Sequence, residues 1–240
     1  MMRNYPEAMR YFDRAISLAP DVPDAYSEKS ELYLLWEGNK EKARVVLEQA
    51  AQNIGSLGKA PFIVLESVSL NMLDGKYQGA LAQLSSCKVE AFSSQFVYIP
   101  KAQLYAQIYG LMGNKELEQA HYESAASIME TRIQQEPNDA RFHSSLGIAY
   151  AGLGRKQDAV REGRLGVEIL PVNKDAMRGF YRAKDLAQIY VMVGEFDLAI
   201  DQIESLLSIP GPLSIPSLRL DPACKPLHDH PRFKKLLEGK

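Results

Sequence analysis

One group of residues near the C-terminus has the types that bind metal ions. Cys224, His228 and His230 lie within seven residues of one another, with Asp229 between the two histidines. Thiolate and imidazole are the ligands that zinc prefers, but this spacing is not that of a common structural zinc site. The alternative is a solvated capping loop. We favour that interpretation, so the sequence predicts no metal site.

A second segment resembles a phosphate-binding turn. Residues 152–156 read Gly-Leu-Gly-Arg-Lys, and a glycine-rich turn before a helix presents backbone N–H groups to anions. However, no predicted strand precedes the segment, no third glycine follows in register, and Lys156 is not followed by Ser or Thr. Neither nucleotide-binding fingerprint is met. We interpret the segment as a turn between two helices.

Two histidines are candidates for acid–base chemistry. His143 precedes Ser144 and Ser145, but adjacent residues on a helix point in different directions, and the nucleophile elbow Gly-x-Ser-x-Gly is missing. His121 has no second ligand four residues away. We interpret both histidines as structural. The sequence therefore predicts no catalytic residue, no cofactor and no enzyme.

Composition narrows the classes of partner and compartment. The 240 residues include 28 basic and 30 acidic side chains, for a net charge of −2, which argues against nucleic acid as a partner. Cys87 and Cys224 are far apart in the sequence, which favours a reducing compartment. The N-terminus has no apolar leader region, and no stretch approaches the roughly 18 apolar residues of a membrane span. We expect a cytoplasmic protein with no membrane contact.

Apolar residues recur at helical intervals along nearly the whole chain. Two classes of break interrupt this pattern. Short breaks contain glycine, whereas longer breaks contain proline, at Pro20, Pro61, Pro137 and Pro171. The short breaks lie at Gly38–Asn39, Asp74–Gly75, Gly113–Asn114, Gly152–Gly154 and Gly194–Glu195. Alternating breaks of this kind predict an all-α fold of antiparallel helix pairs.

Two of these pairs share a motif at the same spacing. The segment Leu146–Tyr150 is followed by Gly154 and Ala159, and Leu186–Tyr190, 40 residues later, is followed by Gly194 and Ala199. This pattern resembles the tetratricopeptide repeat, a two-helix unit of about 34 residues. The resemblance implies an α-solenoid, a right-handed superhelix in which stacked pairs share one core. Small residues such as Gly147 are expected where two helices approach closely. Gly163 and Gly166 should make their helix either fray or pack tightly.

Five repeats follow an incomplete one. Residues 5–20 match only the second helix of a repeat, so we expect this edge to pair with another chain, as a homo-oligomer, or to fray. The first full unit covers about residues 23–55. The second, about 60–87, has Asn71 where the motif has Tyr, and the third, 99–137, has an elongated second helix. The last two units carry the motif described above.

The C-terminal segment changes character because proline recurs throughout it. The run from Leu206 to Leu237 resembles the C-terminal tail of bacterial multidomain signalling proteins, in which tetratricopeptide repeats follow a kinase-, cyclase- or TolB-like region. That family usually has Trp and Arg where this chain has Cys224 and His228. We predict a repeat domain at 1–207 and a proline-rich cap at 208–240. The cap should cover the last helix pair with Leu218, Leu220, Leu227 and Phe233, leaving Arg219, Lys234 and Lys235 outside.

The repeat resemblance also implies a concave groove lined by the first helix of each repeat. Helical periodicity places eight residues in that groove: Gln103, Gln107, Arg141, Ser144, Ile148, Tyr181, Lys184 and Gln188. Arg141 and Lys184 should favour acidic groups on a bound peptide. The alternative is a merely solvated face.

Two functions remain in competition at this point. We favour a scaffold that binds a partner peptide or protein in the groove. The alternative is the C-terminal regulatory or oligomerisation region of a larger bacterial signalling protein whose catalytic domain is absent from this chain.

Overall fold

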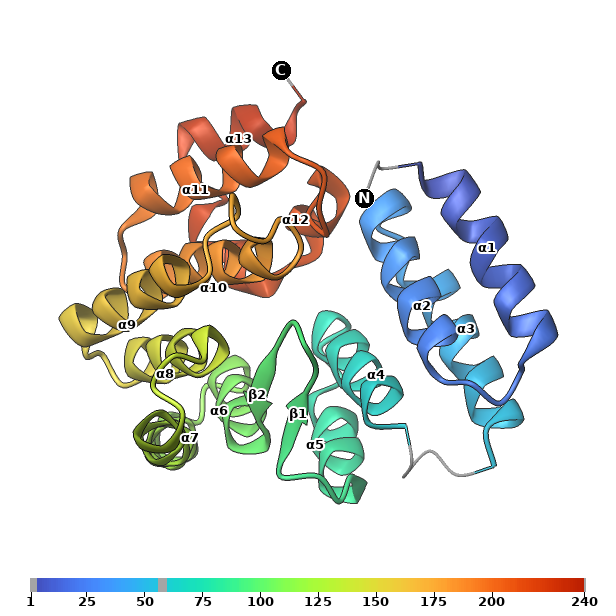
Figure 1. Ribbon diagram of the computed structural model, residues 1–240, viewed down its shortest axis with the longest axis horizontal. Helices are drawn as coiled ribbons and strands as arrows, with labels where there is room; N and C mark the ends of the chain where they lie inside the picture. Colours follow the sequence, from blue (N-terminus) through green and yellow to red (C-terminus); the bar gives the residue numbers. More distant parts are fainter. Residues whose placement is uncertain (1–3, 56–59, 240) are drawn as a thin grey trace. The chain divides into compact units, whose positions relative to one another are not determined.

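The regular structure is almost entirely helical. In the computed structural model (Figure 1), residues 4–55 and 60–239 are described, and within those ranges β1 and β2 are the only strands. Consecutive helices pack in pairs, and the all-α prediction is confirmed. Residues 1–3 and 240, which the predicted domain boundaries include, lie outside the described part of the chain.

By its contacts the chain divides into two compact units. The first unit consists of Met1–Val89 and Pro212–Pro222, and the second consists of Glu90–Gly211 and Ala223–Lys240. The tail is therefore shared between the two units. The domain boundary at residue 207 remains a prediction from the sequence.

The first unit contains the half-repeat and two complete helix pairs. Helix α1 packs against α2, and the pairs are α2 with α3 and α4 with α5. The bounds are α1 Tyr5–Leu18, α2 Asp24–Glu37, α3 Lys40–Asn53, α4 Pro61–Leu73, α5 Tyr77–Ser86 and α12 Ile215–Leu220.

The second unit contains a hairpin, three helix pairs and a terminal helix. Strand β1 pairs with β2, and the helix pairs are α6 with α7, α8 with α9 and α10 with α11. The bounds are β1 Ala91–Ser93, β2 Tyr98–Pro100, α6 Lys101–Leu111, α7 Lys115–Gln135, α8 Ala140–Gly152, α9 Lys156–Ile169, α10 Arg178–Met192, α11 Phe196–Ser208 and α13 Pro231–Leu237. A 3₁₀ turn, η2, covers Pro222–Leu227.

A glycine with positive φ terminates the first helix of every pair. These glycines have φ between 64° and 79°, a left-handed conformation that costs other residues energy. They are Gly38, Gly75, Gly113, Gly154 and Gly194. The five glycine-containing breaks in the sequence are therefore the turns within pairs, as predicted. Gly154 belongs to the segment that resembles a phosphate-binding loop, and it is such a turn.

Two glycines let three helices of the second unit meet closely. A Cβ atom on Gly147 of α8 would lie 2.6 Å from Ile189 Cδ1 and 3.0 Å from the backbone of Ala159. A Cβ atom on Gly163 of α9 would lie 2.7 Å from the same Ile189 methyl group. Ile189 of α10 is fully buried, so its side chain fills the space that the two glycines leave. The close-approach prediction for Gly147 is confirmed, and the glycines of α9 make it pack tightly rather than fray.

The hairpin β1–β2 is a feature that the sequence pattern did not predict. Strands of three residues each pair antiparallel, with Phe92 opposite Ile99. Strand β2 contacts α6 and α8, beside which the hairpin lies in Figure 1. Phe92 is fully buried. Three residues per strand are too few to give a clear period-2 pattern. The helical pattern therefore predicted no regular structure between the second and third repeats.

The proline-rich tail has two parts with different contacts. Helix α13 packs against α11 of the last pair, with Leu227 and Phe233 fully buried. Arg232 adds ion pairs to Asp201 (2.7 Å) and Glu204 (2.9 Å) of α11. This part of the tail therefore covers a surface of the last helix pair.

The earlier part of the tail corrects the prediction. Helix α12 packs against α2 in the first unit, and the Ser214 hydroxyl donates a 2.6 Å hydrogen bond to the buried carbonyl of Leu35. Leu218 is buried as expected, and Leu220 is only half-buried. Arg219, Lys234 and Lys235 are exposed, as predicted.

Candidate functional site

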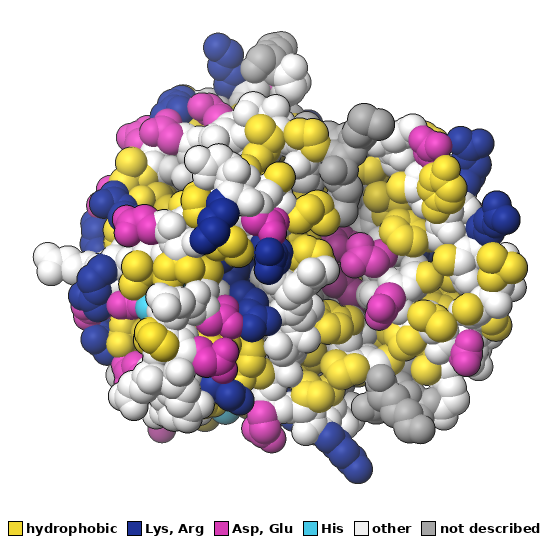
Figure 2. All heavy atoms as spheres, in the orientation of Figure 1, with side chains coloured by type: hydrophobic (Ala, Val, Ile, Leu, Met, Phe, Trp, Pro, Cys, Tyr) yellow, Lys and Arg dark blue, Asp and Glu magenta, His cyan; other side chains and the backbone are white. Residues whose placement is uncertain are grey.

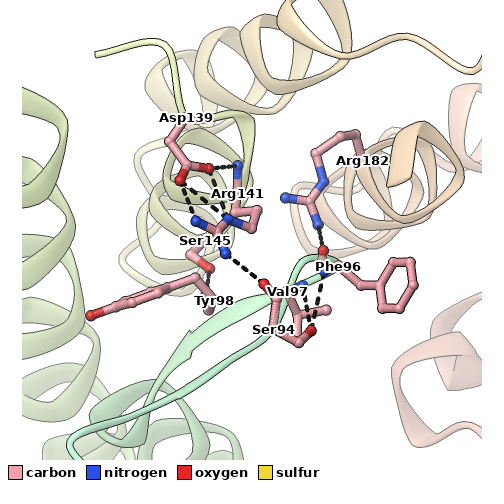
Figure 3. A network of polar contacts seen from close by, with 8 residues as sticks. All are labelled: Ser94, Phe96, Val97, Tyr98, Asp139, Arg141, Ser145 and Arg182. Carbon is pink, nitrogen blue, oxygen red and sulfur yellow. Dashed lines mark hydrogen bonds and ion pairs between the residues drawn. The ribbon is translucent and has the colours of Figure 1, made fainter. Parts of the chain in front are cut away.

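The turn of the hairpin is bound by side chains of α8 and α10 (Figure 3). Arg141 Nη1 donates to the carbonyl of Ser94 at 2.5 Å, and Arg182 Nη2 donates to the carbonyl of Phe96 at 2.5 Å. The Ser145 hydroxyl donates to the carbonyl of Tyr98. Three main-chain carbonyls, at every second residue, are thus held by three side-chain donors. We call Arg141, Ser145, Tyr181 and Arg182 the turn-binding face.

Aromatic contacts add to these hydrogen bonds. The Phe96 ring stacks on the Tyr181 ring of α10, with centroids 5.2 Å apart. The Tyr98 ring packs edge-on against Phe142 of α8 at 4.9 Å. Stacked and edge-on pairs of this kind each contribute about 0.5–1.5 kcal/mol beyond burial. The contacts therefore recognise both the main chain and the aromatic side chains of the turn.

The turn itself is closed by Ser94. Its N–H donates to the Val97 carbonyl at 3.0 Å, and its hydroxyl accepts hydrogen bonds from the N–H groups of Phe96 and Val97. Serine is suited to this position because its side chain replaces missing backbone partners. The carbonyls of Ser94 and Phe96 remain available to the two arginines.

A carboxylate positions the first of these arginines. Asp139 lies at the N-cap of α8, and its side chain accepts from the Arg141 backbone N–H at 2.9 Å and from the guanidinium Nη2 at 2.5 Å. Burial disfavours the charged form of Asp139, but the hydrogen bonds from Arg141 outweigh it and lower the pKa of this carboxyl. The resulting ion pair holds the guanidinium in place beside the turn.

The second arginine is almost completely buried. Arg182 is 1 % exposed and lies 3.1 Å from the carboxylate of Asp185. Burial raises the pKa of the Asp185 carboxyl, although the positive charge of Arg182 acts in the opposite direction. Neither Nε nor Nη1 of Arg182 has a hydrogen-bond partner among the described residues. The turn thus uses only part of the donor capacity of this guanidinium.

The eight residues predicted for the groove divide by exposure. Gln103, Ser144 and Ile148 are 3 %, 1 % and 4 % exposed, so they offer almost no surface. Ile148 belongs to the hydrophobic core of the second unit. The other five are half-buried, and they are Gln107, Arg141, Tyr181, Lys184 and Gln188. Of these, Arg141 and Tyr181 contact the turn directly.

Sequence reasoning missed the remaining members of the turn-binding face. Ser145 and Arg182 each lie one residue after a residue that was predicted for the groove, Ser144 and Tyr181. The predicted strip therefore passed beside them. Arg182 and Asp185 are opposite charges three residues apart on an otherwise apolar face of α10. That spacing is the signal in the sequence that could have identified the buried arginine.

His143 contacts two neighbouring segments through its ring nitrogens. Its Nδ1 lies 2.8 Å from a Glu162 carboxylate oxygen of α9, and its Nε2 lies 2.8 Å from the carbonyl of Pro137. A carboxylate and a carbonyl only accept, so both ring nitrogens can donate at once only when the imidazole is protonated. Burial alone lowers the pKa of His143, but these hydrogen bonds outweigh it and raise the pKa. The same pair lowers the pKa of Glu162.

This pair predicts a pH dependence of stability. Because folding raises the pKa of His143, its stabilisation is complete below the ordinary value of 6.5 and is lost as pH rises through the folded-state pKa. Between these two values the free energy of unfolding should fall by about 1.4 kcal/mol per pH unit. The Glu162 contribution is lost only at acid pH, through its own lowered pKa. Urea unfolding of the wild type and of His143→Gln, from pH 6 to pH 9, measures the effect.

The control for this prediction is His121. Its ring stacks on those of Tyr105 and Tyr109, and burial lowers its pKa. Its loss should leave the slope above pH 6.5 unchanged. An equal slope in His143→Gln and the wild type would mean that His143 does not carry the charge in the folded state.

The remaining observations concern metal ligands, membrane spans and the two cysteines. Within residues 4–55 and 60–239, no group of three or more His, Cys, Asp or Glu side chains is arranged to hold a metal ion. In the same part of the chain, no helix combines the length and the apolar character needed to cross a bilayer. Cys87 and Cys224 are buried and form no disulfide.

The comparisons with known proteins concern the repeats. Residues 111–173, which include α7, α8 and α9, match the model of the tetratricopeptide repeat family. No curated protein matches the sequence. The chain is similar to the crystal structure of the P58(IPK) TPR domain, with 15 % identity over 99 % of this chain and 63 % of that one, at a TM-score of 0.34. It is similar to the crystal structure of yeast Tom70, with 15 % identity over 99 % of this chain and 65 % of that one, at a TM-score of 0.30.

The chain thus spans less than two thirds of both structures, and TM-scores this low support no further inference. The family match and the geometry of the helix pairs carry the assignment instead. Residues 111–173 match the tetratricopeptide repeat family, and the helix pairs of the two units have an all-α, tetratricopeptide-like fold.

Proposed function

We propose that this chain is a protein-interaction module that binds a partner through α8, α10 and the adjoining surface of α6. The observation that carries the proposal is the turn-binding face, where side chains of the repeat helices hold a peptide segment by its main chain and its aromatic rings. Such contacts are the ones that a folded domain uses to bind a peptide of another protein. The proposal includes no catalytic step and no cofactor. A cytoplasmic location is part of the proposal.

The adjoining surface supplies further polar groups. Gln107, Lys184 and Gln188 are half-buried, and each could contact a bound chain beyond the turn. Lys184 and Arg141 should favour acidic groups on the partner, because opposite charges across an interface speed encounter and fix orientation. A peptide with a carboxylate near its aromatic residue fits this chemistry.

Affinity capture from native cells tests this function. The wild-type protein should retain one or a few proteins that Lys184→Glu loses, because the substitution reverses the charge beside the turn-binding face. The control Lys115→Glu reverses a side chain that is 82 % exposed at the start of α7, and it should retain the same proteins. Equal capture by wild type and Lys184→Glu would place the binding surface elsewhere and refute the proposal.

A second candidate is the regulatory or oligomerisation region of a larger bacterial signalling protein. The first unit favours it through α1, where Tyr11 is 63 % and Leu18 is 74 % exposed. Figure 2 shows hydrophobic side chains open to solvent over this part of the chain. Sedimentation of the wild type and of Leu18→Glu distinguishes the two candidates. If the wild type self-associates and Leu18→Glu abolishes the association, the oligomerisation candidate is supported. A wild type that stays monomeric at all concentrations argues against it.

A further inference from the structure

The turn at the tip of the hairpin occupies the surface on which we place the partner. Its carbonyls accept hydrogen bonds from Arg141 and Arg182, and its Phe96 ring stacks on Tyr181. The turn is separated from Arg182 by 86 residues of chain, so this contact is not a by-product of local folding. A partner that uses the same donors cannot bind while the turn is in place.

We propose that the turn Ser94–Val97 is a built-in competitor of the partner, and that the partner presents an aromatic side chain between main-chain carbonyls, as this turn does. The inference rests on the proposed function and specifies the ligand of that same site. Binding is then an exchange in which the hairpin tip leaves and a similar segment of another protein takes its place.

The contacts at the tip favour such an exchange. Almost all the hydrogen bonds that fix the tip to α8 and α10 go to main-chain carbonyls, which any peptide can supply. The tip leaves Nε and Nη1 of the buried Arg182 without an acceptor among the described residues. A partner that brings one more acceptor would pair donors that the tip does not, and an unpaired buried donor is costly.

The hairpin base is anchored separately from the tip. Strands β1 and β2 pair from Ala91–Pro100 to Ser93–Tyr98, Phe92 is fully buried, and β2 leads directly into α6. The tip therefore can leave the turn-binding face while the base stays in position. A tethered tip has an effective concentration on the order of millimolar, so it excludes weak free peptides in the wild type.

The test is a binding measurement on the full chain. The probe is a fluorescein-labelled peptide with the sequence of residues 90–101, closed into a hairpin by a disulfide between added terminal cysteines because short isolated hairpins are marginal. The variant replaces residues 94–97 by Asn-Gly, a two-residue turn that keeps both strands, removes the Phe96 ring and shortens the tip that presents carbonyls to the two arginines. Fluorescence anisotropy should show at least about tenfold tighter binding to the variant than to the wild type, since the competitor has been removed.

Two controls make the result specific. The same peptide with Phe96→Ala should bind the variant at least about tenfold more weakly, because it lacks the ring that stacks on Tyr181. Phe96→Ala in the full chain is a milder way to release the tip, and it should also bind the probe more tightly than the wild type. Circular dichroism confirms that each protein is folded.

Two results would overturn the inference. A folded loop variant that binds the probe no better than the wild type, with Phe96→Ala behaving likewise, means that the turn is a permanent part of the core. Equal binding of the two peptides means that the ring is not recognised. If capture by the wild type still depends on Lys184, the proposed function survives either result and only this inference fails. If capture by the wild type does not depend on Lys184 either, the proposed function and this inference both fail.

Discussion

Replacing Arg182 by alanine should lower the free energy of unfolding of the second unit by about 3–5 kcal/mol. Arg182 is 1 % exposed, and it pairs with the Asp185 carboxylate and with the Phe96 carbonyl. Alanine removes the cation and leaves both acceptors without it, in a position where water does not replace it fully. Urea unfolding at pH 7, followed by circular dichroism at helical wavelengths, measures the loss.

The matched control is on the same helix. Arg178 pairs with Asp175 three residues away, as Arg182 does with Asp185, but its side chain is 48 % exposed. Exposed pairs contribute between about 0 and 1 kcal/mol, so Arg178→Ala should have a small effect. If the two alanine variants lose equal stability, burial does not strengthen the Arg182 contacts and the tip is not held as described.

Replacing Phe233 by alanine should cost about 3–5 kcal/mol, because it removes a fully buried ring from the contact between α13 and α11. The ring also stacks on His228, with centroids 5.9 Å apart. Without it, the apolar face of α11 becomes exposed and the protein should aggregate more readily. Unfolding by urea measures the loss, and hydrogen exchange should show faster exchange in α11 and α13.

Leu218→Ala separates the two parts of the tail. Leu218 is 2 % exposed and lies in α12, which packs against α2. Trp36, the only tryptophan of the chain, also lies in α2, so its fluorescence reports on that neighbourhood. Leu218→Ala should shift the fluorescence transition to lower urea and leave hydrogen exchange in α13 unchanged. Faster exchange in α13 after Leu218→Ala would contradict this division of the tail.

Much of the fold could be predicted because its rules are local. A glycine with positive φ marks each turn within a pair, and its role follows from the absence of a side chain. Gly147 could be assigned to a close helix contact for the same reason, whereas for Gly163 the sequence left fraying and tight packing open. Asn71, which replaces the motif's tyrosine, is buried and donates to Gln83 Oε1 at 2.8 Å. Its polar partner on the next helix could not be inferred from the motif.

The candidate site was predicted only in part because its contacts are distant in sequence. Helical periodicity placed Arg141 and Tyr181 on one strip, and both contact the turn. The segment that they contact lies 47 residues before Arg141 and 86 residues before Arg182, and no local pattern connects them. The contact of Ser214 with Leu35 spans 179 residues, and it escaped the prediction of the cap for the same reason.

Site-specific photo-crosslinking in native cells tests the central claim, that α10 and its neighbours bind a partner protein. A photoreactive amino acid replaces Gln188, which is half-buried on α10, or Gln157, which is exposed on α9 as the control. We expect a discrete crosslinked species from position 188 and none from position 157. A species from position 157 alone, or the same species from both positions, would contradict it.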